Sequence, residues 1–61
     1  MPLVQIELLE GRTVDQKRLL VEKVTQAIVE SLGTPAEKVS IIIRDMAKEN
    51  YATAGKLAGD K

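Results

Sequence analysis

The chain has 61 residues, a formal net charge of zero from nine basic and nine acidic side chains, and neither cysteine nor histidine. This length permits a single domain over residues 1–61, and the missing side chains exclude a disulfide framework, a thiolate or imidazole metal site and a histidine-activated nucleophile. The balanced charge and a single aromatic residue, Tyr51, argue against a nucleic-acid binder that works by charge or by base stacking.

Hydrophobic residues make up 44% of the chain, too many for one small protomer to enclose. Disulfides and metals are not provided for, so oligomerisation is the remaining way to stabilise so short a chain. The sequence has no apolar run of 18 or more residues and no signal-peptide pattern. We therefore expect a soluble cytoplasmic protein with no membrane partner.

Residues 3–9 are predicted to form a β-strand, because apolar residues at every second position alternate with polar ones. A turn marked by a glycine follows. Thr13 and Gln16 have the spacing of a capping box, which begins a helix just after Thr13. The helix is expected over residues 14–32, because Gly33 stands where a left-handed C-cap belongs.

One face of this helix is expected to be buried and the opposite face to be solvated. The spacing of a buried stripe is followed by Leu20, Val24, Ala27, Ile28 and Ser31 or Leu32. The solvated face is interpreted as the charged one, formed by Lys17, Arg18, Glu22, Gln26 and Glu30.

Residues 39–46 are predicted to form a second strand, because Ile41, Ile42 and Ile43 are consecutive β-branched residues that suit a strand covered on both sides. Strand, crossover helix and strand make one βαβ unit, so the two strands should be parallel. In the tail, a turn at residues 48–50 precedes a short extended arm. The expected fold class is α/β (α+β), and its uncovered sheet face and edges predict pairing of protomers and further association.

Pro2 leads straight into the first strand, and removal of Met1 would leave it with a free secondary amine held at the end of a sheet. An α-amine has a pKa of roughly 7.7–8.0, closer to neutrality than a lysine, and burial or a nearby arginine lowers the pKa further. A base whose pKa is near the working pH transfers protons efficiently. Pro2 is therefore a candidate catalytic base; the plainer interpretation is a strand-edge proline.

Several groups of residues occur together at a characteristic spacing: Met1-Pro2, Leu8-Leu9-Glu10-Gly11-Arg12-Thr13, Gln16-Lys17, and Met46-Ala47-Lys48 with Tyr51. Together they resemble the 4-oxalocrotonate tautomerase family, over essentially the whole chain. The resemblance implies small βαβ protomers assembled as a homohexamer, a trimer of dimers. It also implies an isomerase of aromatic hydrocarbon catabolism that uses no cofactor or metal.

The resemblance further implies keto–enol isomerisation of a 2-hydroxydienoate or related 2-oxo acid, with Pro2 as general base. It implies that Arg12 binds a substrate carboxylate, a role that suits a bidentate guanidinium; the alternative is an exposed turn arginine. Leu9, through its backbone, and Tyr51, as an apolar wall with a hydroxyl donor, are the implied substrate-binding residues. Either of these two could equally serve packing.

Ser40 is a departure from the family pattern. Members that act on the dicarboxylate substrate carry a second arginine here, which binds the keto-acid end and stabilises charge on the oxygen. Arg44 is no substitute, because four residues along a strand span roughly 13 Å. Loss of such a group can cost on the order of a hundredfold in rate. The substrate is therefore left open between a muconate-type acid, another 2-hydroxydienoate and an arylpyruvate enol, with Ser40 lining the site.

Two other functions stay open from the sequence. One is a lyase, a hydratase or dehalogenase of unsaturated acids, in which a cationic Pro2 works with an added carboxylate supplied by Glu10 or Glu49. The other is a non-catalytic oligomeric scaffold with a structural Pro2. The protonation state of Pro2 at pH 7 distinguishes the lyase from the isomerase, and the variant Pro2→Ala distinguishes the scaffold from both.

Overall fold

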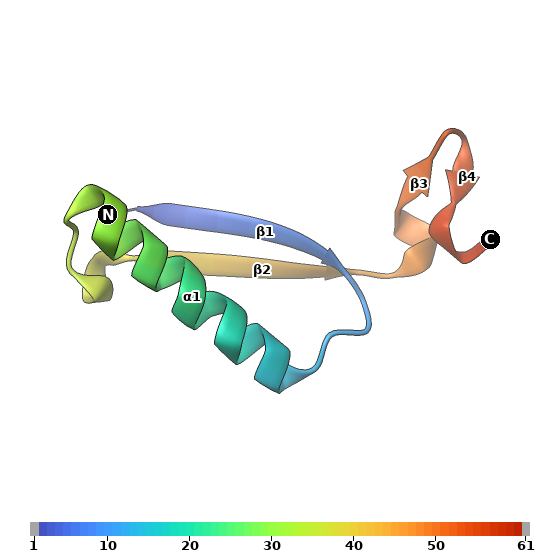
Figure 1. Ribbon diagram of the computed structural model, residues 1–61. Helices are drawn as coiled ribbons and strands as arrows, with labels where there is room; N and C mark the ends of the chain where they lie inside the picture. The colour runs from blue at the N-terminus through green and yellow to red at the C-terminus, as the bar shows by residue number, and fades with distance from the viewer. Residues whose placement is uncertain (1, 61) are drawn as a thin grey trace.

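The computed structural model describes residues 2–60, which form a βαβ unit followed by a small β-hairpin (Figure 1). Strand β1 (Leu3–Leu9) leads into helix α1 (Val14–Leu32), and a single 3-10 turn (Ala36–Lys38) then leads into strand β2 (Ser40–Met46). These bounds agree with the elements predicted from the sequence, apart from one residue at the start of β2.

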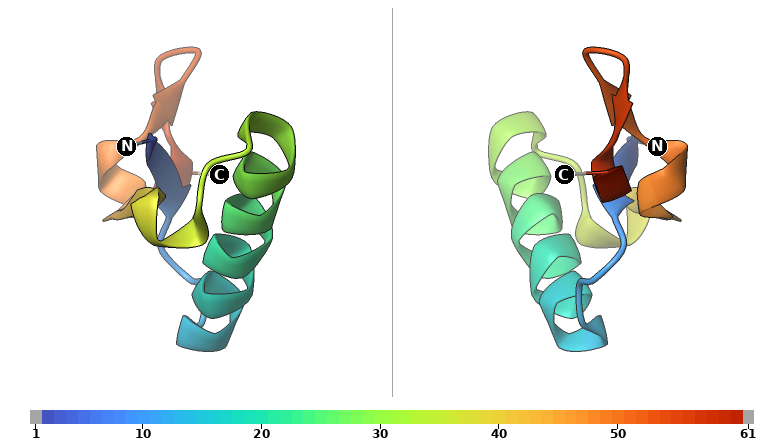
Figure 2. Two further views of the ribbon diagram at one scale, coloured as in Figure 1. Left: turned by 90° about the vertical axis from the view of Figure 1, so that its left-hand side faces the viewer. Right: turned by 90° about the vertical axis from the view of Figure 1, so that its right-hand side faces the viewer.

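Strands β1 and β2 pair in parallel, with Leu3 opposite Ser40 and Leu9 opposite Met46. The predicted βαβ unit is thereby confirmed. Helix α1 covers one face of this two-stranded sheet (Figure 2). It is the only α-helix among residues 2–60, and the other helical segments are single 3-10 turns. Within residues 2–60, no helix combines the length and the apolar character that crossing a membrane requires.

The ends of α1 are fixed by the predicted local contacts. Thr13 Oγ1 accepts a hydrogen bond from the Gln16 N–H at 3.1 Å, and Gln16 Oε1 accepts one from the Thr13 N–H at 2.9 Å, which completes the capping box. At the other end Gly33 adopts a left-handed φ of 70°, and its N–H donates to the Val29 carbonyl at 3.0 Å. The start of the helix is therefore set by residues directly after the turn.

No side chain among residues 2–60 is fully buried in the single chain. The apolar side chains between helix and sheet are only half-buried: Val4, Ile6, Leu8, Leu20, Val24, Ile28, Ile41 and Ile43. On the sheet face away from α1, Leu3 remains 48% exposed and Ile42 40% exposed. Ile42, expected to be covered, is thus open to solvent in one protomer, and the helix alone does not enclose the apolar residues.

The buried and solvated faces of α1 differ from the prediction at their edges. Ala27, Ser31 and Leu32, expected within the buried stripe, are exposed. Lys17, expected on the solvated face, is half-buried and forms an ion pair with Asp45. Apolar residues lie on several adjoining faces of this helix, so its rotation is settled by packing on the sheet and not by periodicity. The half-buried stripe consists of Lys17, Leu20, Val21, Val24, Thr25, Ile28 and Val29.

The C-terminal arm turns back on itself. After the expected turn, a single 3-10 turn at Lys48–Asn50, strand β3 (Ala52–Thr53) pairs antiparallel with strand β4 (Lys56–Leu57). The two residues between them, Ala54 and Gly55, have positive φ angles of 55° and 80°. A two-residue loop with positive φ at both positions is the type I′ hairpin turn, which an expectation of a simple extended arm did not include. The hairpin lies beyond the end of β2 (Figure 1).

Ala54 occupies a backbone conformation that costs a non-glycine residue about 1 kcal/mol or more, whereas asparagine tolerates it. We expect Ala54→Asn to raise the free energy of unfolding by about 0.5–1 kcal/mol. Chemical denaturation at one fixed protein concentration measures this, because association is linked to stability. Ala52→Asn, in strand β3, is the matched control and should give no gain. An Ala54→Asn protein no more stable than the parent contradicts the prediction.

Candidate functional site

The candidate site residues lie at two opposite ends of the sheet. Pro2 comes just before β1, next to Ser40 at the start of β2, whereas Arg12 follows Leu9 at the far end of β1. Strand β1 has seven residues, and a rise of about 3.3 Å per residue separates its ends by roughly 20 Å. Within one chain, Pro2 and Arg12 are therefore not brought together.

At the first end, Pro2 is tied into the sheet. Its carbonyl accepts a hydrogen bond from the Ser40 N–H at 3.0 Å, which extends the ladder one residue beyond the paired strands. Pro2 is half-buried, and Ser40 is exposed. Pro2 is thus held beside a residue whose side chain is open to solvent.

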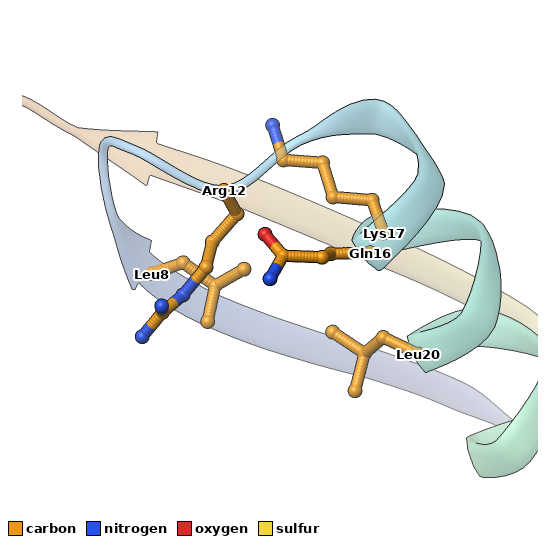
Figure 3. Close-up of a pocket in the computed structure, with 5 residues that line it drawn as sticks. All are labelled: Leu8, Arg12, Gln16, Lys17 and Leu20. Atoms are coloured by element: carbon orange, nitrogen blue, oxygen red, sulfur yellow. The ribbon is translucent and has the colours of Figure 1, made fainter.

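At the second end, Arg12 lines an open cavity of about 270 Å³ (Figure 3). The cavity is walled by Leu8 from β1 and by Gln16, Lys17 and Leu20 from the first turns of α1. Figure 3 shows the Arg12 side chain running alongside Leu8, with its guanidinium on the side away from the Lys17 ammonium. The cavity combines apolar walls with a guanidinium, as a small organic acid requires.

Arg12 differs from the other two arginines of the chain in its ion pairing. Arg18 pairs with Asp15 at 2.7 Å, and Arg44 pairs with Glu7 at 2.8 Å. Among residues 2–60, no carboxylate lies within 4.0 Å of the Arg12 guanidinium. Arg12 is therefore the arginine whose donors are open to an external anion. Arg44 is paired with Glu7 and lies four positions along β2 from Ser40. It therefore cannot take the place of an arginine at position 40.

Leu9 and Tyr51 lie at the Arg12 end of the sheet. Leu9 is half-buried opposite Met46. Tyr51 follows the 3-10 turn, is 45% exposed, and its carbonyl accepts a hydrogen bond from the Ala58 N–H at 2.8 Å. The structure thus divides the predicted residues into two sets, with Pro2 and Ser40 at one end and Leu9, Arg12 and Tyr51 at the other.

The two carboxylates considered for a lyase also lie at the Arg12 end. Glu10 Oε2 accepts a hydrogen bond from the Lys48 N–H at 3.1 Å, and Glu49 is exposed in the adjacent turn. Neither is placed beside Pro2 in the same chain. Among residues 2–60, no cluster of three or more acidic side chains is suited to hold a metal ion.

Sequence reasoning missed one contact near the cavity. Lys17 Nζ lies 2.6 Å from Asp45 Oδ2, joining the first turns of α1 to the end of β2. The available signal was topological: in a parallel βαβ unit, the start of the helix and the end of the second strand lie at the same end of the sheet.

The comparisons with known proteins agree with this architecture. The family model described as "Tautomerase enzyme" matches residues 2–61. The chain is 52% identical to the 2-hydroxymuconate tautomerase of Bacillus subtilis (strain 168), over 98% of this chain and 97% of that protein. The crystal structure of YwhB, a homologue of 4-oxalocrotonate tautomerase, matches with a TM-score of 0.93 and 50% identity over 98% of both chains. A heterohexamer 4-oxalocrotonate tautomerase from Chloroflexus aurantiacus J-10-fl matches with a TM-score of 0.93 and 27% identity, over 98% of this chain and 97% of that chain.

Proposed function

Because the chain belongs to the tautomerase family, a family of isomerases, we propose that it interconverts the enol and keto forms of an unsaturated 2-hydroxy or 2-oxo acid without a cofactor. The observation that carries the proposal is the placement of Pro2, which is half-buried and anchored to β2 through its carbonyl. 2-Hydroxymuconate, the substrate in the name of the Bacillus subtilis relative, is the first candidate. A role in aromatic hydrocarbon catabolism follows from that substrate and stays a prediction.

The proposed mechanism is a proton transfer from oxygen to carbon. Once Met1 is removed, the neutral amine of Pro2 takes the proton of the substrate hydroxyl. The electron pair of that O–H bond becomes part of the new carbonyl, and the double bonds shift toward a distant carbon. The protonated amine then gives a proton to that carbon, which returns Pro2 to its neutral form. A free α-amine suits both steps, because its pKa of roughly 7.7–8.0 is close to neutral pH.

Arg12 is proposed to bind a substrate carboxylate. Its guanidinium has no carboxylate partner among residues 2–60, and it presents parallel N–H donors that match a carboxylate. Leu8 and Leu20 supply apolar walls next to it, and a less polar surrounding strengthens the charge interaction. The Leu9 backbone and the Tyr51 ring are proposed to border the bound acid.

The active site is proposed to be shared between copies of the chain. The roughly 20 Å between the two ends of β1 is longer than a small unsaturated acid, so Arg12 of one copy must act with Pro2 of another. Two features support such an assembly: none of residues 2–60 is fully buried, and Leu3 and Ile42 are exposed on the uncovered sheet face. We propose a homohexamer, a trimer of dimers; the Chloroflexus aurantiacus relative is a heterohexamer.

Pro2→Ala replaces the secondary amine of the proline ring by a primary α-amine, so a base remains at the N-terminus but the ring that fixes its position is lost. Misplacement of a reacting group can cost about a hundredfold in rate, and we expect Pro2→Ala to lose about ten- to a hundredfold in kcat/KM on 2-hydroxymuconate and on phenylenolpyruvate. Intact mass must first show that Met1 is absent, because a retained methionine converts the amine to an amide without basicity. Undiminished activity in a preparation that retains Met1 would exclude Pro2 as the base.

The pH profile distinguishes the isomerase from a lyase. The neutral amine is the base, so kcat/KM on 2-hydroxymuconate should fall as the pH drops below the pKa of Pro2. A lyase with a cationic proline has the opposite dependence and loses activity as the pH rises. The profile is measured between pH 5 and 9 at constant ionic strength, and a fall toward high pH refutes the isomerase mechanism.

The shared site is tested by mixing two variants, each of which is impaired in one of the two groups. The Pro2→Ala chain retains Arg12, and the Arg12→Ala chain retains Pro2. If sites form between copies, unfolding and refolding the two together restores sites that contain both residues, and activity should exceed that of either variant refolded alone. If the site lies within one chain, the mixture gives no more than the average of the two separate preparations.

Ser40 is expected to limit activity on the dicarboxylate. Its position beside Pro2 leads us to expect that Ser40→Arg raises kcat/KM for 2-hydroxymuconate about tenfold or more, through stabilisation of charge on the reacting oxygen. Ser40→Gln, long but uncharged, is the matched control and should give little gain. Equal effects of the two substitutions would show that length, and not charge, matters at this position.

A further inference from the structure

We propose that Asp45, through its ion pair with Lys17, is a positioning residue for Arg12, and that Glu10 provides a second anchor for the same turn. This inference rests on the proposed role of Arg12 as the carboxylate-binding residue and names the contacts that hold its guanidinium in place.

The turn that carries Arg12 has little packing of its own. Gly11 and Arg12 are both exposed, and Gly11 has a φ of 119°, a backbone conformation that favours glycine. A Cβ atom added at Gly11 would meet nothing within 4 Å. The position of Arg12 must therefore be set by the segments on either side of it.

Both flanks of Arg12 are fastened to one short segment at the end of β2. Before Arg12, the Glu10 N–H donates to the Met46 carbonyl at 2.8 Å, and Glu10 Oε2 accepts from the Lys48 N–H at 3.1 Å. After Arg12, Lys17 Nζ lies 2.6 Å from Asp45 Oδ2. Three contacts therefore hold the turn from both sides against residues 45–48.

The Lys17–Asp45 pair is the least exposed of the three ion pairs among residues 2–60. Its side chains are 28% and 42% exposed, those of Arg44 and Glu7 are 48% and 52% exposed, and those of Arg18 and Asp15, within one helical turn, are 73% and 90% exposed. Water screens a partly shielded pair less than an exposed one. The Lys17–Asp45 pair also joins residues that are 28 positions apart, so it fixes α1 to β2.

Lys17 and Arg12 also line the same cavity (Figure 3). The bond to Asp45 keeps the Lys17 ammonium on the side of the cavity away from the guanidinium. Without Asp45, two cations would share the cavity with no fixed separation, and the first turns of α1 would lose their attachment to β2. Both changes would alter substrate binding only by moving the Arg12 guanidinium.

The test measures kinetics on 2-hydroxymuconate with the assembled protein. We expect Asp45→Asn to raise KM about tenfold with a smaller change in kcat, as for a misplaced binding group. Lys17→Gln should reproduce this result from the other side of the pair, and Asp45→Glu should restore most of the affinity. Asp15→Asn breaks the exposed pair with Arg18 and is the matched control, with unchanged KM.

A double variant separates positioning from a general effect on structure. If Asp45 acts through Arg12, Arg12→Ala/Asp45→Asn should bind no more weakly than Arg12→Ala alone. An additional tenfold loss in the double variant, or an unchanged KM in both Asp45→Asn and Lys17→Gln, would overturn the inference. If Arg12→Ala itself leaves KM unchanged, the proposed carboxylate-binding role fails, and the inference fails with it for that separate reason.

Discussion

The parallel pairing of β1 and β2 is the constraint on which the other features of this chain depend. In a parallel pair the two strand starts lie together and the two strand ends lie together, so Pro2 meets Ser40, while Glu10, in the turn that carries Arg12, meets the end of β2 and the segment after it. The length of β1 then keeps Pro2 and Arg12 apart within one protomer. A reaction that needs a base and a carboxylate-binding group must take them from different copies.

The same arrangement links stability to activity. One helix on one face of a two-stranded sheet leaves every side chain of residues 2–60 at least partly accessible, and so small an assembly of elements has little independent stability. Association would cover Leu3 and Ile42 and would also bring Pro2 of one copy to Arg12 of another. Because one set of contacts would provide both, dissociation should remove the folded core and the active site together.

Local patterns were sufficient to predict β1, α1 and β2, but they predicted neither the hairpin of β3 and β4 nor how the helix packs on the sheet. The capping box at Thr13, the C-cap at Gly33 and the alternation in β1 involve neighbouring residues only, and the structure contains all three. The rotation of α1, which draws Lys17 toward Asp45, depends on the register of a strand 28 residues away. Likewise, the resemblance to the family led us to expect Pro2 and Arg12 in one active site. The length of β1 shows that these two residues of the same chain lie at opposite ends of the sheet.

The division of the sheet into two ends would also separate two determinants of substrate choice under the proposed function. Arg12, whose turn is held by contacts of Glu10 and Lys17, is proposed to select for a carboxylate at one end. Ser40, whose N–H is bonded to the Pro2 carbonyl, is proposed to lie beside the part of the substrate that undergoes proton transfer at the other end. Because no hydrogen bond or ion pair among residues 2–60 joins these two positions directly, a change at Ser40 should leave the turn around Arg12 intact and affect only the part of the acid that reacts.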